Sequence, residues 1–150
     1  MATAAMNPDF ADLLRAFCAA RVRSIVVGAY ALAFHSRPRA TGDMDIWVEP
    51  TPENARSVLQ ALRIFGAPLD EVDARDFETP GVVFQIGVPP RRIDLLTDLT
   101  GLTFAEAWDD RITTEMLGIK IDFLGRASLI KNKRALGRLK DLADIEMLEG

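Results

Sequence analysis

Apolar residues recur along the chain at two spacings, one helical and one alternating. A helix is predicted from Asn7-Pro8, a side-chain cap followed by a proline at the first helical position. Its apolar stripe consists of Phe10, Leu13, Leu14 and Phe17. A second helix is predicted from Thr51-Pro52-Glu53, which repeats the cap and proline. Its stripe consists of Ala55, Val58, Leu59 and Leu62.

Strands are predicted where short apolar or β-branched runs are bounded by turn residues. The predicted strands are Ser24 to Val27, Asp43 to Glu49, Val82 to Gly87, Arg92 to Leu96, Ile112 to Leu117 and Ile119 to Leu124. Residues 88–91 form a hairpin connection, and Gly28 ends the first strand before a short helix over Ala29 to Phe34.

The C-terminal third is predicted to be mostly helical. A helical turn is expected near Phe104 to Trp108. A longer helix is expected to begin near Ser128 and to be interrupted at Gly137. The last helix presents Leu142, Ile145 and Leu148 to the core. With no repeat or linker, this order predicts one α/β or α+β domain over residues 1–150, a sandwich with a mixed sheet.

The composition is that of an ordinary globular protein. Of 150 residues, 49% are hydrophobic and 27% charged. No apolar run approaches the roughly 20 residues that cross a bilayer, and the N-terminus lacks the features of a secretory signal. Because Cys18 is the only cysteine, a disulfide framework and a cysteine zinc site are excluded. We therefore expect a cytoplasmic protein.

Charge is distributed unevenly. A net charge of −4 argues against a general nucleic-acid coat protein. Between residues 126 and 140, however, no acidic residue accompanies the six basic ones: Arg126, Lys131, Lys133, Arg134, Arg138 and Lys140. A local anion site is therefore favoured over a broad basic face.

The strongest chemical signal is the pair Asp43 and Asp45. Residues two apart on a strand point to one face, with α-carbons about 6.6 Å apart. Two close carboxylates raise one another's pKa unless a cation lies between them. Hard oxygen ligands of this kind suit Mg²⁺.

Asp94 is a third carboxylate, alone in an apolar strand. If that strand lies beside the pair, the three side chains can hold two metal ions about 3.5–4 Å apart, the arrangement for in-line displacement at phosphorus. Asp94 would also help to deprotonate an attacking hydroxyl. By itself, Asp-x-Asp is more often a solvated strand face or turn, and Asp94 an edge residue paired with Arg91 or Arg92.

The turn at Gly28 favours a metal and phosphate site over these structural alternatives. It ends a strand and begins a helix of small residues, where backbone N–H groups can face a phosphate. The loop between this turn and the carboxylates carries Arg37 and Arg39.

Three ordered motifs now resemble a known family, the DNA polymerase beta-type nucleotidyltransferase superfamily. They are residues 28–33 (GAYALA), 41–46 (TGDMDI) and 93–96 (IDLL). The closer likeness is to small bacterial members related to the toxins of type IV, abortive-infection toxin–antitoxin systems, and it includes the late segment 133–144. It runs from about Ile25 to Ile145 and implies a nucleotidyltransferase fold, a central mixed β-sheet flanked by helices with a helical C-terminus.

The resemblance implies that Asp43, Asp45 and Asp94 bind Mg²⁺ or Mn²⁺. It also implies that Gly28 and Ala29 contact the triphosphate, although Ala29 stands where glycine or serine is usual. We further assign the following residues to the site: Arg39, Thr41, Arg138 and Lys140 to nucleotide binding, and Lys133 to catalysis.

The basic C-terminal residues have a second interpretation. A run of charges is often a solvated face. Asp141 and Asp144, one turn apart, would then pair with Lys140 or Arg138. Alternatively, they orient a catalytic lysine.

The leading functional hypothesis is Mg²⁺-dependent transfer of a nucleoside monophosphate from an NTP such as ATP to a hydroxyl. The acceptor is an RNA end such as that of tRNA, a protein or a small molecule. One alternative is a non-catalytic nucleotide-binding or partner-binding module. Another is a subunit that works beside a partner chain, such as an antitoxin. No membrane partner is expected.

Four other residues are predicted to be structural. His35 is expected in a loop or at a helix end, and Cys18 is expected to be buried. Trp47 and Trp108 are expected in the core or an interface rather than stacked on a base.

Overall fold

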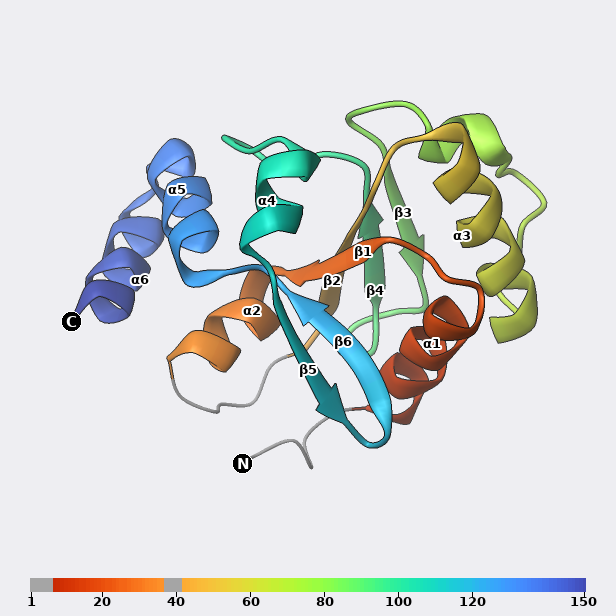
Figure 1. Cartoon of the computed structure of the whole chain (residues 1–150), viewed down its shortest axis with the longest axis horizontal. Coiled ribbons are helices and arrows are strands. Elements are labelled where there is room, and N and C mark those ends of the chain that lie inside the picture. The colour runs from red at the N-terminus through yellow and green to blue at the C-terminus, as the bar shows by residue number, and fades with distance from the viewer. Residues whose placement is uncertain (1–6, 37–41) are drawn as a thin grey trace.

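The computed structural model describes residues 7–36 and 42–150. Its centre is a mixed six-stranded sheet in the order β3-β4-β2-β1-β6-β5 (Figure 1). The strands are β1 (Ser24–Val27), β2 (Met44–Val48), β3 (Val83–Ile86), β4 (Ile93–Leu96), β5 (Ile112–Met116) and β6 (Ile119–Phe123). β1 pairs with β6 and β2 with β4 in parallel, and the other three pairs are antiparallel. All six predicted strands are present, and β3 and β4 form the predicted hairpin.

Helices flank this sheet. They are α1 (Pro8–Ala19), α2 (Gly28–His35), α3 (Pro52–Phe65), the short 3₁₀ helix η2 (Ala74–Phe77), α4 (Phe104–Asp110), α5 (Arg126–Leu136) and α6 (Leu139–Glu149). As predicted, Asn7 and Thr51 cap α1 and α3, since their side chains accept the backbone N–H groups of Asp9 and Asn54. The predicted α/β class, with helices around a mixed sheet and a helical C-terminus, is confirmed.

The core lies on both faces of the sheet because strand side chains alternate between them. Met44, Ile46 and Val48 of β2 join a buried cluster with α1 and α3. Trp47, between them, joins a second cluster with residues of α2, α4, α5 and α6. Asp45 has the same parity as Trp47, so its side chain lies on the second face, the one that α2 covers.

The C-terminal helices follow the expectation that Gly137 interrupts them. Gly137 adopts a left-handed backbone, with φ of 66°, and ends α5. A new helix, α6, starts two residues later, and Figure 1 shows the two side by side. Lys133 and Lys140 therefore belong to different helices and do not share one continuous face.

One local expectation needs correction. Cys18 is exposed rather than buried, because it follows the buried Phe17 at the margin of the apolar stripe of α1. The acidic segment after α3 contains η2, where Asp73 and Asp76 form a capping box. Within the described residues, no helix combines the length and hydrophobicity needed to cross a membrane.

Asn54, in the first turn of α3, ties this helix to the sheet. Its side chain accepts the N–H of Arg23 at 2.8 Å and donates to the carbonyls of Arg23 and Glu49, each at 3.0 Å. The side chain is only 5% exposed, so water cannot replace these bonds easily.

We predict that Asn54→Ala lowers the free energy of unfolding by about 2–3 kcal/mol, because buried backbone groups lose their partners. Urea denaturation measures this change. Ser57→Ala, one turn later on α3, is the control and should stay within about 0.5 kcal/mol of the parent chain. Equal stability of the two variants would contradict this role for Asn54.

Candidate metal and nucleotide site

The pairing of β2 with β4 places two of the predicted site residues side by side. The strands run parallel, and Asp45 lies opposite Asp94 in the register. Opposed residues on neighbouring strands project from the same face, so the two carboxylates share a surface. Asp94 is 8% exposed on an interior strand. The alternative that Asp94 lies at a sheet edge is therefore wrong.

Gly28, at the end of the neighbouring strand β1, lies against Asp45 on the side of β2 away from β4. β1 runs antiparallel to β2 with Val27 opposite Asp45, so the next residue, Gly28, reaches the Asp45 side chain. Its φ is +65°, and a Cβ added there would lie 3.3 Å from Cβ and Cγ of Asp45 and closer still to Oδ2. Glycine is therefore required for both its backbone conformation and its small volume.

The helix that starts at Gly28 directs its N-terminus to the same place. Val27, at the N-cap of α2, provides no side-chain hydrogen bond. The first N–H groups of a helix have no partner within it. Here Gly28 and Ala29 carry two of them, and Gly28 lies against the Asp45 carboxylate. The predicted strand, glycine turn and helix are confirmed.

Arg92 neutralises part of the negative charge. Its backbone N–H donates to Oδ1 of Asp43 at 3.1 Å, and Nη2 lies 3.5 Å from Oδ2 of the same residue. Nε lies 2.9 Å from Oδ1 of Asp94, and Nη2 donates to Oδ2 at 3.3 Å. The sequence predicts Arg92 only as an alternative salt-bridge partner of Asp94, and this pairing is confirmed. Its spacing two residues before Asp94 was the available signal for a shared face.

Arg92 does not fully satisfy the carboxylates. Burial, and then the charges of Asp94 and Asp43, raise the pKa of Asp45 to about 6, although Arg92 acts in the opposite direction. Oδ1 of Asp94 is buried and makes no well-aligned hydrogen bond, despite the nearby Nε. Buried polar atoms are normally paired, and this oxygen can take a further ligand only if the guanidinium of Arg92 moves away from it.

The ligand type at this site suits a hard metal ion, but the present positions of the side chains do not. Carboxylate oxygens are the ligands that Mg²⁺ prefers, and a buried oxygen of Asp94 without a well-aligned hydrogen bond is among them. Within residues 7–36 and 42–150, however, no three acidic, histidine or cysteine side chains are grouped closely enough to hold an ion. Arg92 spans Asp43 and Asp94, so a bound cation would require its guanidinium to move aside.

Lys133 and Arg138, near the junction of the C-terminal helices, form ion pairs with acidic residues of α6. Nζ of Lys133 lies 2.9 Å from Asp144 and 3.6 Å from Asp141, and its side chain is only 12% exposed. Arg138 also binds Asp141, with Nε donating at 2.6 Å and Nη2 at 3.1 Å. The hydrogen bond from Arg138 holds the pKa of Asp141 at about 2. Because Lys133 lies on α5 and its partners Asp141 and Asp144 lie on α6, these ion pairs connect the two helices.

The remaining predicted site residues have different outcomes. Asp141 pairs with Arg138 and Lys133, and Asp144 pairs with Lys133, so the predicted alternative pairing holds for Arg138. Among the described residues, Lys140 has no carboxylate within ion-pair distance. Lys140 is exposed. Arg39 and Thr41 lie outside the described residues. The catalytic role of Lys133 and the nucleotide-binding roles of Arg138 and Lys140 stay predictions.

The structural residues mostly follow expectation. His35 ends α2, where a ring nitrogen lies 2.6 Å from the carbonyl oxygen of Leu124. Trp47 is 1% exposed in the core, edge-on to Phe104. Trp108 is half-buried and stacks on Phe104.

Comparison with known proteins supports the fold and leaves the family open. No protein-family model matches the chain, and no curated protein matches it. A crystal structure at 1.87 Å of a Thermotoga maritima protein, proposed to be a nucleotidyltransferase, resembles it with a TM-score of 0.55. The likeness covers 96% of this chain and 92% of that chain at 17% sequence identity. The chain therefore shares the fold of that protein.

Proposed function

We propose that the chain is a metal-dependent nucleotidyltransferase, which moves a nucleoside monophosphate from an NTP to a hydroxyl. The observation that carries this proposal is the in-register pairing of Asp45 with Asp94 beside the glycine turn that starts α2. The carboxylates are ligands for a cation, and the uncapped N–H groups at the start of the helix are donors for an anion. A metal–triphosphate complex needs both, because the metal ion is positive and the triphosphate is negative.

Each group has a role in this reaction. Asp43, Asp45 and Asp94 would hold Mg²⁺ or Mn²⁺, which, when bound, neutralises charge on the phosphates. The N–H groups of Gly28 and Ala29 bind the triphosphate. The acceptor hydroxyl forms a bond to the α-phosphorus as the bond to pyrophosphate breaks, and the hydroxyl proton passes to the Asp94 carboxylate.

We also propose an acceptor class and a biological setting for this reaction. The hydroxyl belongs to an RNA 3′ end, such as that of tRNA, to a protein or to a small molecule. The sequence resemblance supports a relation to toxin–antitoxin systems, and hence a partner antitoxin chain. NTP is an intracellular substrate, so we place the reaction in the cytoplasm.

One observation favours a second candidate, a nucleotide-binding or partner-binding module without turnover. Arg92 already supplies a cation between Asp43 and Asp94. Ala29, where the family usually has glycine or serine, adds to the case. The two candidates differ in whether a metal ion displaces Arg92.

We predict that Arg92→Ala tightens Mn²⁺ binding about tenfold, because the guanidinium no longer competes for Asp43 and Asp94. Isothermal calorimetry or the electron paramagnetic resonance signal of free Mn²⁺ measures it. Arg91→Ala removes the same charge from the exposed neighbouring residue and should change the affinity less than twofold. Unchanged or weaker binding by Arg92→Ala would favour the module.

We also predict that Asp45→Asn and Asp94→Asn each reduce nucleotidyl transfer more than a hundredfold, because electrostatic stabilisation of the transferred phosphate is lost. The assay uses α-labelled NTPs, Mg²⁺ and total tRNA or the protein itself as acceptor. Asp98→Asn, an exposed carboxylate just beyond β4, is the matched control and should retain activity.

The outcomes of this assay separate the two candidates. Transfer that Asp45→Asn leaves intact would overturn the proposed mechanism. If no acceptor is labelled although calorimetry detects binding of NTP with Mg²⁺, the chain is a binding module.

A further inference from the structure

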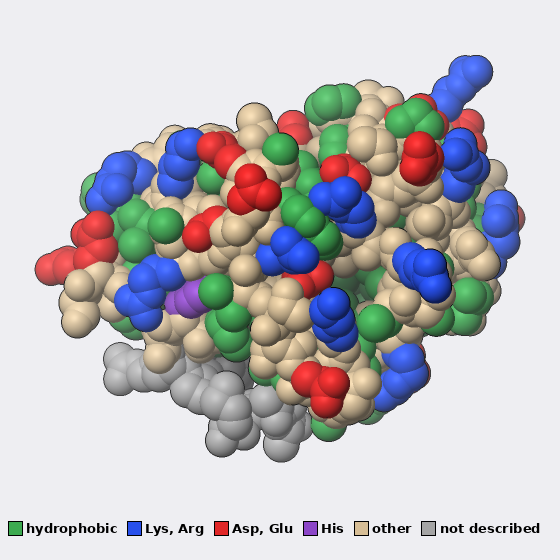
Figure 2. All heavy atoms as spheres, viewed as in Figure 1, with side chains coloured by type: hydrophobic (Ala, Val, Ile, Leu, Met, Phe, Trp, Pro, Cys, Tyr) green, Lys and Arg blue, Asp and Glu red, His purple; other side chains and the backbone are tan. Residues whose placement is uncertain are grey.

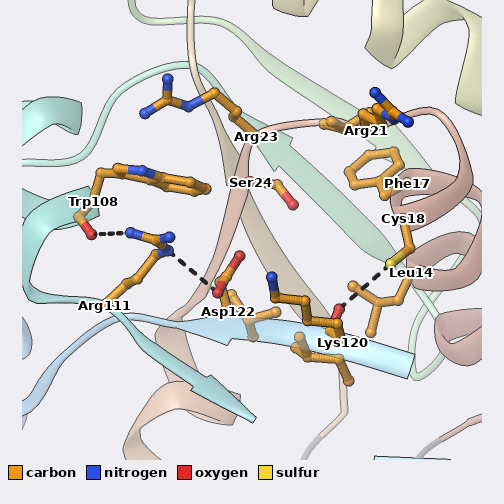
Figure 3. Close-up of a pocket in the computed structure, with 13 residues that line it drawn as sticks. Leu14, Phe17, Cys18, Arg21, Arg23, Ser24, Trp108, Arg111, Lys120 and Asp122 are labelled. Carbon is orange, nitrogen blue, oxygen red and sulfur yellow. Dashed lines mark hydrogen bonds and ion pairs between the residues drawn. The ribbon is translucent and has the colours of Figure 1, made fainter. Parts of the chain in front are cut away.

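A cavity of about 260 Å³ lies at the end of β1 opposite Gly28 (Figure 3). Ser24 of β1, Phe17 and Cys18 of α1, and Lys120 and Asp122 of β6 form part of its wall. Ser24 and Gly28 are separated by about 13 Å along an extended strand. None of the three candidate metal ligands lines the cavity, so it is separate from the proposed catalytic site.

The wall of this cavity is strongly basic. It includes four cationic side chains, Arg21, Arg23, Arg111 and Lys120, and a single carboxylate, Asp122. The chain as a whole carries a net charge of −4, so this local excess runs against the overall charge. Figure 2 shows Lys and Arg side chains gathered around a hollow in the middle of the face, where β1, β6 and α1 meet in Figure 1.

Trp108 holds two of these cations in fixed positions. The guanidinium carbon of Arg111 lies 3.6 Å from the centroid of the indole ring, and that of Arg23 lies 4.4 Å from it. Cation–π attraction of this kind offsets the repulsion between two nearby like charges. Because both guanidinium groups already contact the ring, Trp108 organises cations rather than stacking on a base.

Arg111 retains unused hydrogen-bonding capacity. Nη1 donates to the carbonyl of Trp108 at 2.8 Å, and Nε lies 3.3 Å from Oδ1 of Asp122. Nε is nevertheless buried and makes no well-aligned hydrogen bond. The Arg111 side chain is therefore held in position, while its Nε–H donor still lacks a well-aligned acceptor.

Two further cations are exposed and uncommitted. Among the described residues, neither Arg21 nor Lys120 has a carboxylate within ion-pair distance. Arg23 lies 3.5 Å from Glu49, which is not part of the wall. In Figure 3, Lys120 and Asp122 project from β6 toward Ser24.

We propose that this cavity binds a terminal phosphate or a diphosphate group. Such a group carries two or more negative charges and accepts several hydrogen bonds, which suits the two arginines held by Trp108 and the exposed Arg21 and Lys120. The volume supports a small anion, because it equals about nine waters at roughly 30 Å³ each. It also lies below the 300 Å³ or so at which pockets hold drug-sized ligands.

The same phosphate chemistry has two sources. One is a free ion such as pyrophosphate, and the other is the 5′-phosphate at the end of a nucleic acid. The cavity holds the phosphate in either case, and the rest of a nucleic acid would extend into solvent. The experiment below separates them.

Trp108 provides a local reporter, because it contacts two of the cations while the other tryptophan, Trp47, is buried in the core. Pyrophosphate, tripolyphosphate and a short oligonucleotide with or without a 5′-phosphate are titrated against the full chain in EDTA. We expect a saturable change in tryptophan emission that Trp108→Phe abolishes. Asp45→Asn should leave this change intact, whether or not the proposed transferase activity exists.

The double variant Arg21→Ala/Lys120→Ala should weaken binding about tenfold, which corresponds to about 1.4 kcal/mol. Arg56→Ala/Arg63→Ala, two exposed cations on α3, is the matched control with the same change in net charge and should bind within twofold of the parent chain. Lys120→Glu is a second test at the cavity that leaves Arg21 intact. Equal melting temperatures verify folding.

The result that only the 5′-phosphorylated oligonucleotide binds identifies a nucleic-acid end as the source, and binding of pyrophosphate identifies a free ion. The proposal is overturned if no probe gives a saturable signal, or if the α3 control loses affinity as strongly as the cavity variant. Loss of binding in Asp45→Asn, or equal binding of the oligonucleotide without its 5′-phosphate, would overturn it as well.

Discussion

The parallel pairing of β2 with β4 is the contact on which the candidate site depends. It sets Asp45 and Asp94 side by side, although α3, η2 and β3 lie between them in the sequence. The antiparallel pairing of β1 with β2 then brings Gly28 against Asp45. A shift of one residue in either register would turn a carboxylate to the opposite face, where the core with α1 and α3 is packed.

This arrangement is electrostatically expensive, and the protein offsets the cost only in part. Burial and neighbouring carboxylates raise the pKa of Asp45, while Arg92 supplies one positive charge among three acidic groups. A buried oxygen of Asp94 remains without an aligned partner. Such unsatisfied groups persist where a ligand completes them, which is why we interpret the site as functional. The basic cavity at the other end of β1 has the opposite imbalance, an excess of cations.

Much of the fold was predictable from local patterns. Caps at Asn7 and Thr51, strand-like runs and the glycine at residue 28 identified the main elements, because each depends on neighbouring residues alone. The candidate carboxylates were also named in advance. The placement of Arg92 between them was not, since it depends on the side-chain packing of two strands. The basic cavity was missed for the same reason: Arg23, Trp108 and Lys120 come from separate elements and have no common motif.

The proposed function requires Asp43, Asp45 and Asp94 to receive a metal–nucleotide complex at the N-terminus of α2. A crystal structure of the chain with Mn²⁺ and a non-hydrolysable NTP analogue would show this complex, because anomalous scattering locates the metal. We expect a metal peak at these carboxylates, the triphosphate on the N–H groups of Gly28 and Ala29, and Arg92 displaced. A nucleotide bound elsewhere, with Arg92 still between Asp43 and Asp94, would contradict it.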